Sequence, residues 1–145
     1  MYQQNGRIMK NNTYDELAYS AMAARASAYS PYSGITVGAA LLTASGRMYL
    51  GANIENASYS ATLCAERVAF FKAVSEGERD FVAIAIAGGK HGEDVRSAFP
   101  PCGACRQVMK EFCDPDFTVI VVNSESYTVH TLAELLPLAF DEGYL

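Results

Sequence analysis

The chain has 145 residues, of which 50% are hydrophobic and 19% are charged, and its formal net charge is −5. This length is typical of one domain, so we expect residues 1–145 to form a single domain with a flexible N-terminal extension over residues 1–12. The eleven Lys and Arg residues form no basic cluster, which argues against nucleic acid as a partner. A small or neutral ligand suits this charge better.

The hydrophobic runs of the chain argue against a membrane partner. The N-terminal stretch MYQQNGRIMKNN is polar and lacks the apolar core of a signal peptide. The longest apolar runs, VGAALL and FVAIAIAGG, are far shorter than the ~18 residues that a membrane span needs. We therefore expect a cytoplasmic protein, in which the four cysteines stay reduced and serve as ligands or packing residues rather than disulfides.

The first part of the chain predicts a helix followed by two strands. The segment TYDE (Thr13–Glu16) is a capping-box pattern that opens a helix, which should end by Ser30 because Pro31 follows. The stretch ITVGAALLTASGRMYLGANIE then predicts two strands joined by a turn at Ser45–Gly46. The first of these strands is mostly apolar, so we expect it to be buried.

The second part of the chain alternates helices with apolar strands. A helix that starts at Cys64 should end near Gly77, a residue suited to a C-cap. FVAIAIAGG and FTVIVVN predict buried strands, with a cysteine-bearing helix, PPCGACRQVMKEF, between them. The short strand YTVHT follows too closely for a crossover, so it should pair antiparallel, and TLAE (Thr131–Glu134) opens a last helix. Strands that alternate with helices indicate an α/β layered sheet.

Three cysteines stand at the start of the two cysteine-bearing helices. Cys102 and Cys105 form a C-x-x-C pair, which alone is as consistent with redox chemistry or packing as with a metal. Cys64 completes a set of three zinc ligands with a free fourth position, as in catalytic rather than structural zinc sites. Cys113 lies ~12 Å along the helix axis from Cys105, too far for the same ion, and is expected to be a buried packing residue.

Glu66 follows Cys64 by two residues, beside the free position of such a site. A carboxylate there can take a proton from a zinc-bound water and pass it to a substrate nitrogen. An isolated glutamate in a first helical turn would instead be a solvated residue favoured by the helix dipole. The neighbouring cysteines favour the catalytic interpretation.

The sequence resembles the small homotetrameric zinc-dependent cytidine deaminases. The zinc deaminase signature combines H-x-E with P-C-x-x-C and allows a three-cysteine site, and this chain has CAE and PCGAC. The resemblance extends from about residue 13 to residue 140 through AYSPYS, VGAALL, NIENASYSATLCAERVA, PPCGACRQV and ELLPLAF. It implies a three-layer α/β/α domain with a five-stranded mixed sheet and one Zn²⁺ per chain, bound by Cys64, Cys102 and Cys105.

The resemblance also implies which residues bind the nucleoside. Asn53 and Glu55 would hold the sugar hydroxyl, and Ala65 would offer its backbone N–H to the base. In a homotetramer with composite active sites, three further residues would come from a neighbouring subunit: Ala57, Tyr59 and Phe140. From the residues alone, Asn53 and Glu55 could be turn residues, and Phe140 could equally be a core anchor.

Ile35 departs from the family pattern. Similar enzymes commonly carry PYSxF, whose aromatic ring borders the base, whereas this chain has PYSGI. The fold does not depend on that ring. One wall of the pocket around Ile35 therefore differs, and with it the expected affinity for the base.

Arg67 is the expected partner of the metal ligands. Zn²⁺ with three thiolates carries a net negative charge, which disfavours the formation of hydroxide. Similar enzymes place an arginine beside the sulfur atoms, and hydrogen bonds from Arg67 would withdraw that charge. The alternative is a surface ion pair of Arg67 with Glu66 or Glu76.

The expected activity is the hydrolytic deamination of cytidine and 2′-deoxycytidine to the uridine nucleosides and ammonia, a step of pyrimidine salvage. A deaminase of an aminonucleoside antibiotic should lack the NIE segment that this chain has. A nucleic-acid editing deaminase usually has His as its first ligand and a basic surface. A non-enzymatic zinc or redox module needs a fourth ligand or a reducible cysteine pair, and it leaves Glu66 unexplained.

Overall fold

The computed structural model describes residues 3–4, 7–8 and 12–145. The expected flexible extension over residues 1–12 lies for the most part outside these residues. Two short strands, β1 (Gln3–Gln4) and β2 (Arg7–Ile8), pair antiparallel in a sheet of their own. In the part of the chain that the structure describes, no helix combines the length and the apolar character that a bilayer span requires.

The central sheet is five-stranded and mixed, as predicted. Its strands are β3 (Ile35–Thr43), β4 (Met48–Ala52), β5 (Phe81–Lys90), β6 (Thr118–Val122) and β7 (Tyr127–Thr131). Their order is β4-β3-β5-β6-β7. The β5–β6 pair is parallel, and the other neighbouring pairs are antiparallel. The antiparallel β6–β7 pair confirms the expectation from its short link.

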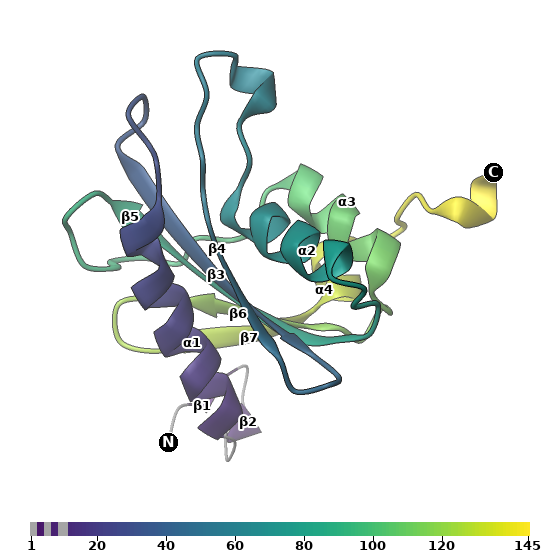
Figure 1. The fold of residues 1–145 in the computed structure, drawn as a ribbon. Helices are drawn as coiled ribbons and strands as arrows, with labels where there is room; N and C mark the ends of the chain where they lie inside the picture. The colour runs from purple at the N-terminus through teal and green to yellow at the C-terminus, as the bar shows by residue number, and fades with distance from the viewer. Residues whose placement is uncertain (1–2, 5–6, 9–11) are drawn as a thin grey trace.

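Helices cover both faces of this sheet. The α-helices are α1 (Asn12–Ala24), α2 (Ala65–Ser75), α3 (Gly103–Phe112) and α4 (Leu132–Leu135). The described residues also form short 3-10 helices, which are η1 (Arg25–Ser27), η2 (Tyr59–Ala61) and η3 (Glu142–Tyr144). Helix α1 crosses one face, and α2, α3 and α4 lie on the other (Figure 1). The three-layer α/β/α architecture is therefore confirmed.

Side-chain size differs between the two faces of strand β5. Ala83, Ala85 and Ala87 belong to the core beneath α1, together with Leu17 and Ala21 of that helix. The alternate residues of the strand, Ile84 and Ile86, belong to the core beneath α2 and α3. Because successive side chains of a strand point to opposite faces, this segment is apolar throughout and buried on both sides. Small residues on the first face allow α1 to lie close to the sheet.

The predicted ends of α2, α3 and α4 form as expected, whereas α1 begins at Asn12, one residue before the Thr13 that was expected to open it. Cys64 and Cys102 are the N-cap residues of α2 and α3. Gly77, with φ of +97°, follows α2 in the left-handed conformation of a C-terminal cap. The Thr131 hydroxyl accepts from the Glu134 N–H at 3.2 Å, and the Glu134 carboxylate accepts from the Thr131 N–H at 2.9 Å, which completes the predicted capping box.

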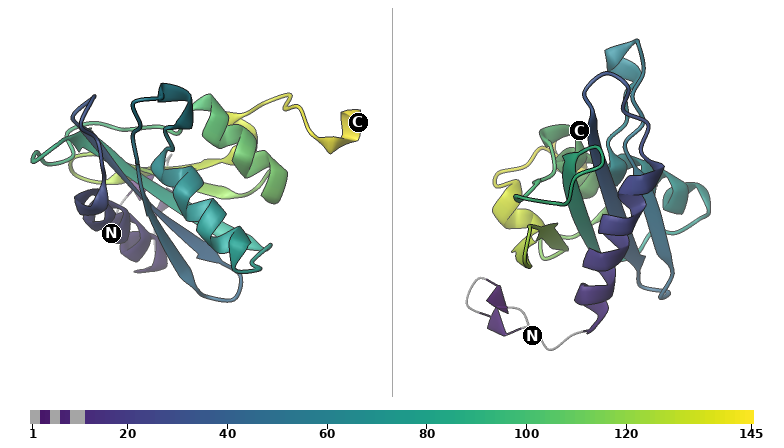
Figure 2. Two further views of the ribbon diagram at one scale, coloured as in Figure 1. Left: turned by 45° about the horizontal axis from the view of Figure 1, so that its top comes forward. Right: turned by 90° about the vertical axis from the view of Figure 1, so that its left-hand side faces the viewer.

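Two segments project from the body of the domain. The connection from β4 to α2 carries η2 at its tip, and the C-terminal residues 136–145 form an arm that extends past α3 (Figures 1 and 2). Large apolar side chains of the arm are open to solvent: Leu138, Phe140, Tyr144 and Leu145. Exposed apolar side chains gathered on one segment are typical of a surface that another protein covers.

Gly38 of β3 lies directly beneath α1. A Cβ atom at this position would lie 2.0 Å from the Ala21 carbonyl oxygen and 2.7 Å from the Arg25 nitrogen. We expect Gly38→Ala to displace α1 and to lower the free energy of unfolding by about 1–3 kcal/mol, measured by urea denaturation. Gly103→Ala is the control, because its Cβ meets no atom within 4 Å. Equal midpoints for Gly38→Ala and the parent would contradict the close contact of α1 with β3.

Candidate active site

Three thiols meet where α2 and α3 begin. The Sγ atoms of Cys64 and Cys102 are 3.7 Å apart, and those of Cys102 and Cys105 are 3.4 Å apart. All three lie within 4.8 Å of one another, and among the described residues no further His, Cys, Asp or Glu joins this group. Tetrahedral zinc with Zn–S bonds of about 2.3 Å separates its sulfur ligands by about 3.8 Å. The thiol group therefore fits one zinc ion and leaves a fourth position free.

Arg106 holds the turn that precedes α3. Its Nε donates to the Pro101 carbonyl at 2.8 Å, and its Nη1 donates to the Leu135 carbonyl at 2.6 Å. These bonds tie the entrance of α3 to the end of α4, and they keep Cys102 in place as the N-cap. The sequence alone does not single out Arg106 as a site residue, although it directly follows Cys105 in the segment PPCGACRQV.

The electrostatics of the thiol group favour an ionised sulfur at Cys64. A hydrogen bond with the Cys105 thiol, supported by the Arg67 guanidinium, lowers the pKa of Cys64 to about 5. The same contact raises the pKa of Cys105, because one thiol ionises more easily while its neighbour keeps its proton. A thiol that coordinates a metal ion is deprotonated outright. By contrast, burial raises the pKa of Cys113 to about 12, as expected of a packing residue.

Glu66 is buried beside the thiols. It lies in the first turn of α2 with an exposed fraction of only 3%. Burial raises the pKa of its carboxyl group, because desolvation penalises the charged form. The structure therefore excludes the alternative of a solvated first-turn glutamate.

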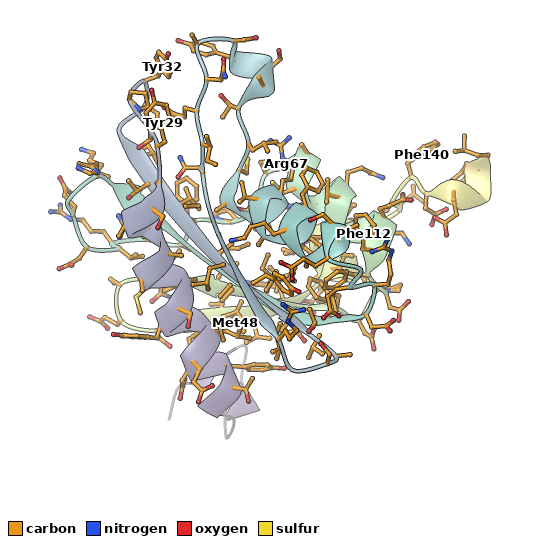
Figure 3. The ribbon with its side chains drawn as sticks, viewed as in Figure 1. Tyr29, Tyr32, Met48, Arg67, Phe112 and Phe140 are labelled. Carbon is orange, nitrogen blue, oxygen red and sulfur yellow. The ribbon has the colours of Figure 1, made fainter. Side chains whose placement is uncertain are left out.

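Arg67 points toward the sulfur atoms. Its Nη2 lies 3.5 Å from the Cys64 Sγ and 3.4 Å from the Thr62 carbonyl oxygen. Its Nε is buried and has no hydrogen-bond partner among the described residues. Glu76, one of the alternative partners, instead accepts from Arg47 at 2.8 Å. Figure 3 shows Arg67 near the entrance of α2.

Asn53 is bound to strand β3. Its Oδ1 accepts from the Val37 N–H at 2.8 Å, and its Nδ2 donates to the Ile35 carbonyl at 2.9 Å. The side chain is 7% exposed, and each of its two polar atoms keeps capacity for one more bond. Asn53 is therefore a fixed polar group at the start of β3.

Glu55 lies in a cavity of about 340 Å³ that Tyr32, Ser33, Tyr59 and Thr62 also line. Its carboxylate accepts from the backbone N–H groups of Tyr32 at 3.0 Å and Ser33 at 3.1 Å, and from the Ser33 hydroxyl. The hydroxyl contact is the main cause of its lowered pKa, so the carboxylate is ionised at neutral pH. An ionised carboxylate in an open cavity can accept hydrogen bonds from a neutral sugar.

The remaining predicted site residues divide into two groups. Ala65 is fully buried at the start of α2. The first N–H groups of a helix have no intrahelical partner. Ile35 packs at the edge of the core beneath α2 and α3. Ala57, Tyr59 and Phe140 lie on the two projecting segments. Tyr59 is 75% exposed in the cavity of its own chain's Glu55, and Phe140 is 58% exposed on the arm (Figure 3).

Comparisons with known proteins agree on one family. Residues 12–121 match the family described as the cytidine and deoxycytidylate deaminase zinc-binding region. A cytidine deaminase of Halalkalibacterium halodurans is 53% identical over 86% of this chain and 91% of that protein. A cytidine deaminase of Sporosarcina psychrophila is 47% identical over 88% of this chain and 91% of that protein. The crystal structure of a cytidine deaminase from Burkholderia pseudomallei matches with a TM-score of 0.79 and 44% identity, covering 87% of this chain and 98% of that chain.

The chain belongs to the cytidine and deoxycytidylate deaminase zinc-binding family. The zinc-binding character of this family and the spacing of the thiol group agree, so the cofactor is zinc, with one ion per chain. The sequence expectation for the cofactor is therefore confirmed.

Cysteine substitutions test the ligand set. We expect Cys102→Ser to lose most of its zinc, because two thiols are insufficient to hold the ion. Cys113→Ser should keep one zinc per chain, because Cys113 lies outside the thiol group. Zinc per chain is measured by plasma mass spectrometry after dialysis. Full zinc content in Cys102→Ser, or equal loss in both variants, would contradict the assignment.

Proposed function

We propose that this protein is a zinc-dependent hydrolase that converts cytidine and 2′-deoxycytidine to uridine and 2′-deoxyuridine with release of ammonia. The observation that carries this proposal is the group of three thiols with a buried glutamate in contact with it. A closed structural zinc site would instead need a fourth protein ligand. The similar proteins of Halalkalibacterium halodurans and Sporosarcina psychrophila and the similar crystal structure are cytidine deaminases, which supports the same activity.

Glu66 is the proton carrier of the reaction. Zinc, when bound, supplies an activated water for attack on C4 of the pyrimidine. The Glu66 carboxylate accepts the proton that this water loses and donates it to N3 of the base. The proton of the new C4 hydroxyl then passes through the Glu66 carboxylate to the amino group, and ammonia leaves as the C4–N bond breaks and the C4 carbonyl forms. The burial of Glu66 supports this role, because a proton held away from bulk water passes to the substrate rather than to solvent.

Arg67 offsets the negative charge of the thiolates. Its guanidinium lies within 3.5 Å of the Cys64 sulfur, and such donors around metal ligands tune the metal. The Arg67 Nε is buried and has no hydrogen-bond partner among the described residues. This supports the same role, because an ionised thiolate sulfur would supply the acceptor that the Nε lacks. An arginine suits this role because it stays charged at any working pH.

The nucleoside is bound by groups around the start of β3. Asn53 and Glu55 receive the sugar, the first through its spare amide valences and the second through its ionised carboxylate. The backbone N–H of Ala65 donates to the base, and Ile35 lies against the ring. A neutral substrate fits this site, because no cationic side chain lines the described cavity around Glu55.

The active unit is a homotetramer whose sites are completed by neighbouring subunits. The exposed arm with Phe140 and the projecting segment with Ala57 and Tyr59 support this proposal, because an isolated chain leaves these apolar side chains in water. Each chain contributes one domain over residues 1–145. The protein acts in the cytoplasm, where its thiols stay reduced.

An antibiotic deaminase is the main competing activity. It would use the same metal and Glu66 but would have no need of a sugar-binding Asn53 and Glu55. Incubating the zinc-loaded protein with cytidine, 2′-deoxycytidine, cytosine and blasticidin S, and following loss of absorbance, separates these cases. The proposal requires turnover of the two cytosine nucleosides, and turnover of blasticidin S alone would contradict it.

Glu66→Gln separates proton transfer from zinc binding. We expect this variant to keep one zinc per chain and to lose at least ~10²-fold in kcat for cytidine, because general acid–base catalysis supplies at least that factor. Zinc content and ammonia release are measured on the same preparation. A variant within about tenfold of the parent would show that Glu66 is not the proton carrier.

Mixed tetramers test the contribution of Phe140 from a neighbouring subunit. We expect Phe140→Ala alone to be impaired by about tenfold or more, and Leu145→Ala, also on the arm, to behave like the parent. Glu66→Gln and Phe140→Ala chains, unfolded and refolded together, should regain activity. In such mixtures some sites combine an intact Glu66 with an intact Phe140 from the other chain. A mixture no more active than the average of its two components would contradict the composite site.

A further inference from the structure

We propose that the aromatic ring of Phe99 packs against the pyrimidine of the substrate, beside Ile35, which has no aromatic ring of its own. This inference rests on the proposed function and names a substrate contact that the signature motifs do not contain. Phe99 stands in the loop between β5 and α3, three residues before Cys102.

Phe99 is seated on the backbone of strand β5. A Cβ atom built on Gly88 would lie 2.5 Å from the Phe99 Cγ and 2.8 Å from both Cδ atoms. The ring therefore occupies the space that any side chain at residue 88 would fill. Glycine at this position is required for the ring to approach the strand so closely.

The ring lies on the face of the sheet that carries the thiols. Gly88 pairs with Val37 of β3, and Val37 is part of the core beneath α2 and α3. Ile35, two residues earlier on the same strand, points to the same face. Phe99 and Ile35 both pack against that core, and together with Gly88 they line a cavity of about 270 Å³.

Asn53 bonds to strand β3 beside the cavity that Ile35 and Phe99 line. The Asn53 amide bonds to the backbone of Ile35 at 2.9 Å and of Val37 at 2.8 Å; Ile35 lines the same cavity as Phe99, and Val37 pairs with Gly88. A nucleoside whose sugar meets Asn53 therefore brings its base toward this end of the sheet. An aliphatic side chain provides contact area there, whereas an aromatic ring adds a directional edge or face contact with the base.

The loop that carries Phe99 is firmly held. The Arg25 Nη2 donates to the Lys90 carbonyl at 3.1 Å and to the Glu93 carbonyl at 2.9 Å, while its Nε donates to the Thr36 carbonyl at 3.1 Å. Val95 anchors the middle of the loop in the core beneath α1. A ring on a loop fixed in this way is preorganised for a ligand, so less ordering is required on binding.

Binding of uridine, the reaction product, to the zinc-loaded protein tests this proposal. Phe99→Leu keeps an apolar side chain and removes the ring, so we expect a roughly two- to tenfold weaker uridine Kd and a similar rise in KM for cytidine, with kcat within about twofold. Phe99→Tyr should match the parent. Adding Ile35→Phe to Phe99→Leu should restore most of the affinity, because the ring returns to the same cavity.

Phe81→Leu is the matched control. Phe81 begins the same strand and is also half-buried, but its ring packs with Phe70 and Phe112. We expect this variant to lower the melting temperature and to leave the uridine Kd unchanged. An equal loss of uridine affinity in Phe81→Leu and Phe99→Leu would assign Phe99 to packing alone.

A nuclear Overhauser measurement on the parent protein tests the contact between Phe99 and uridine directly, even if Phe99→Leu does not fold. We expect contacts between the H5 or H6 proton of bound uridine and the ring protons of Phe99. Contacts to other residues and none to Phe99, or an unchanged Kd in a folded Phe99→Leu, would overturn the proposal. Ammonia release from cytidine by the parent separately tests the proposed function. An active parent whose bound uridine makes no contact with Phe99 would refute the Phe99 contact and leave the proposed function intact.

Discussion

The convergence of three thiols at two helix entrances is the constraint on which the site depends. Three thiolates within 4.8 Å of one another repel strongly, and a folded chain can hold them only with compensating positive charge. The N-termini of α2 and α3 supply part of that charge through their free N–H groups, Arg67 supplies another part, and Zn²⁺ supplies most of it. Binding of zinc is therefore coupled to the integrity of the helix entrances, and loss of the metal should loosen both.

The rest of the fold positions these entrances. Small residues on one face of β3 and β5 bring α1 close to the sheet, whereas Ile84, Ile86 and Phe70 fill the other face beneath α2 and α3. Because the two cysteine-bearing helices lie on that second face, their N-termini reach the same end of the sheet as Asn53. The thiol group, the buried Glu66 and Asn53 thus lie toward one end of the sheet, whereas Tyr59 and Phe140 lie on the projecting segments.

Much of this arrangement was predictable from local sequence patterns. Capping residues and apolar runs predicted the helix entrances at Cys64 and Thr131 and the buried strand β5, because these signals act over a few residues. The cysteine spacing, with Glu66 beside it, predicted the zinc site. Contacts between distant segments were not predictable: Arg106 with Leu135, Ser33 with Glu55, and Phe99 with Gly88 arise only when the sheet order brings their backbones together. Residues of that kind carry no local signature in a single sequence.

X-ray absorption at the zinc edge, on the zinc-loaded protein without substrate, identifies the atoms that bind the metal. We expect three sulfur neighbours at about 2.3 Å and one lighter neighbour at about 2.0 Å, which is the solvent ligand of an open catalytic site. Four sulfur neighbours, or two sulfur neighbours with two nitrogen ligands, would contradict a site built from Cys64, Cys102 and Cys105 with a free fourth position.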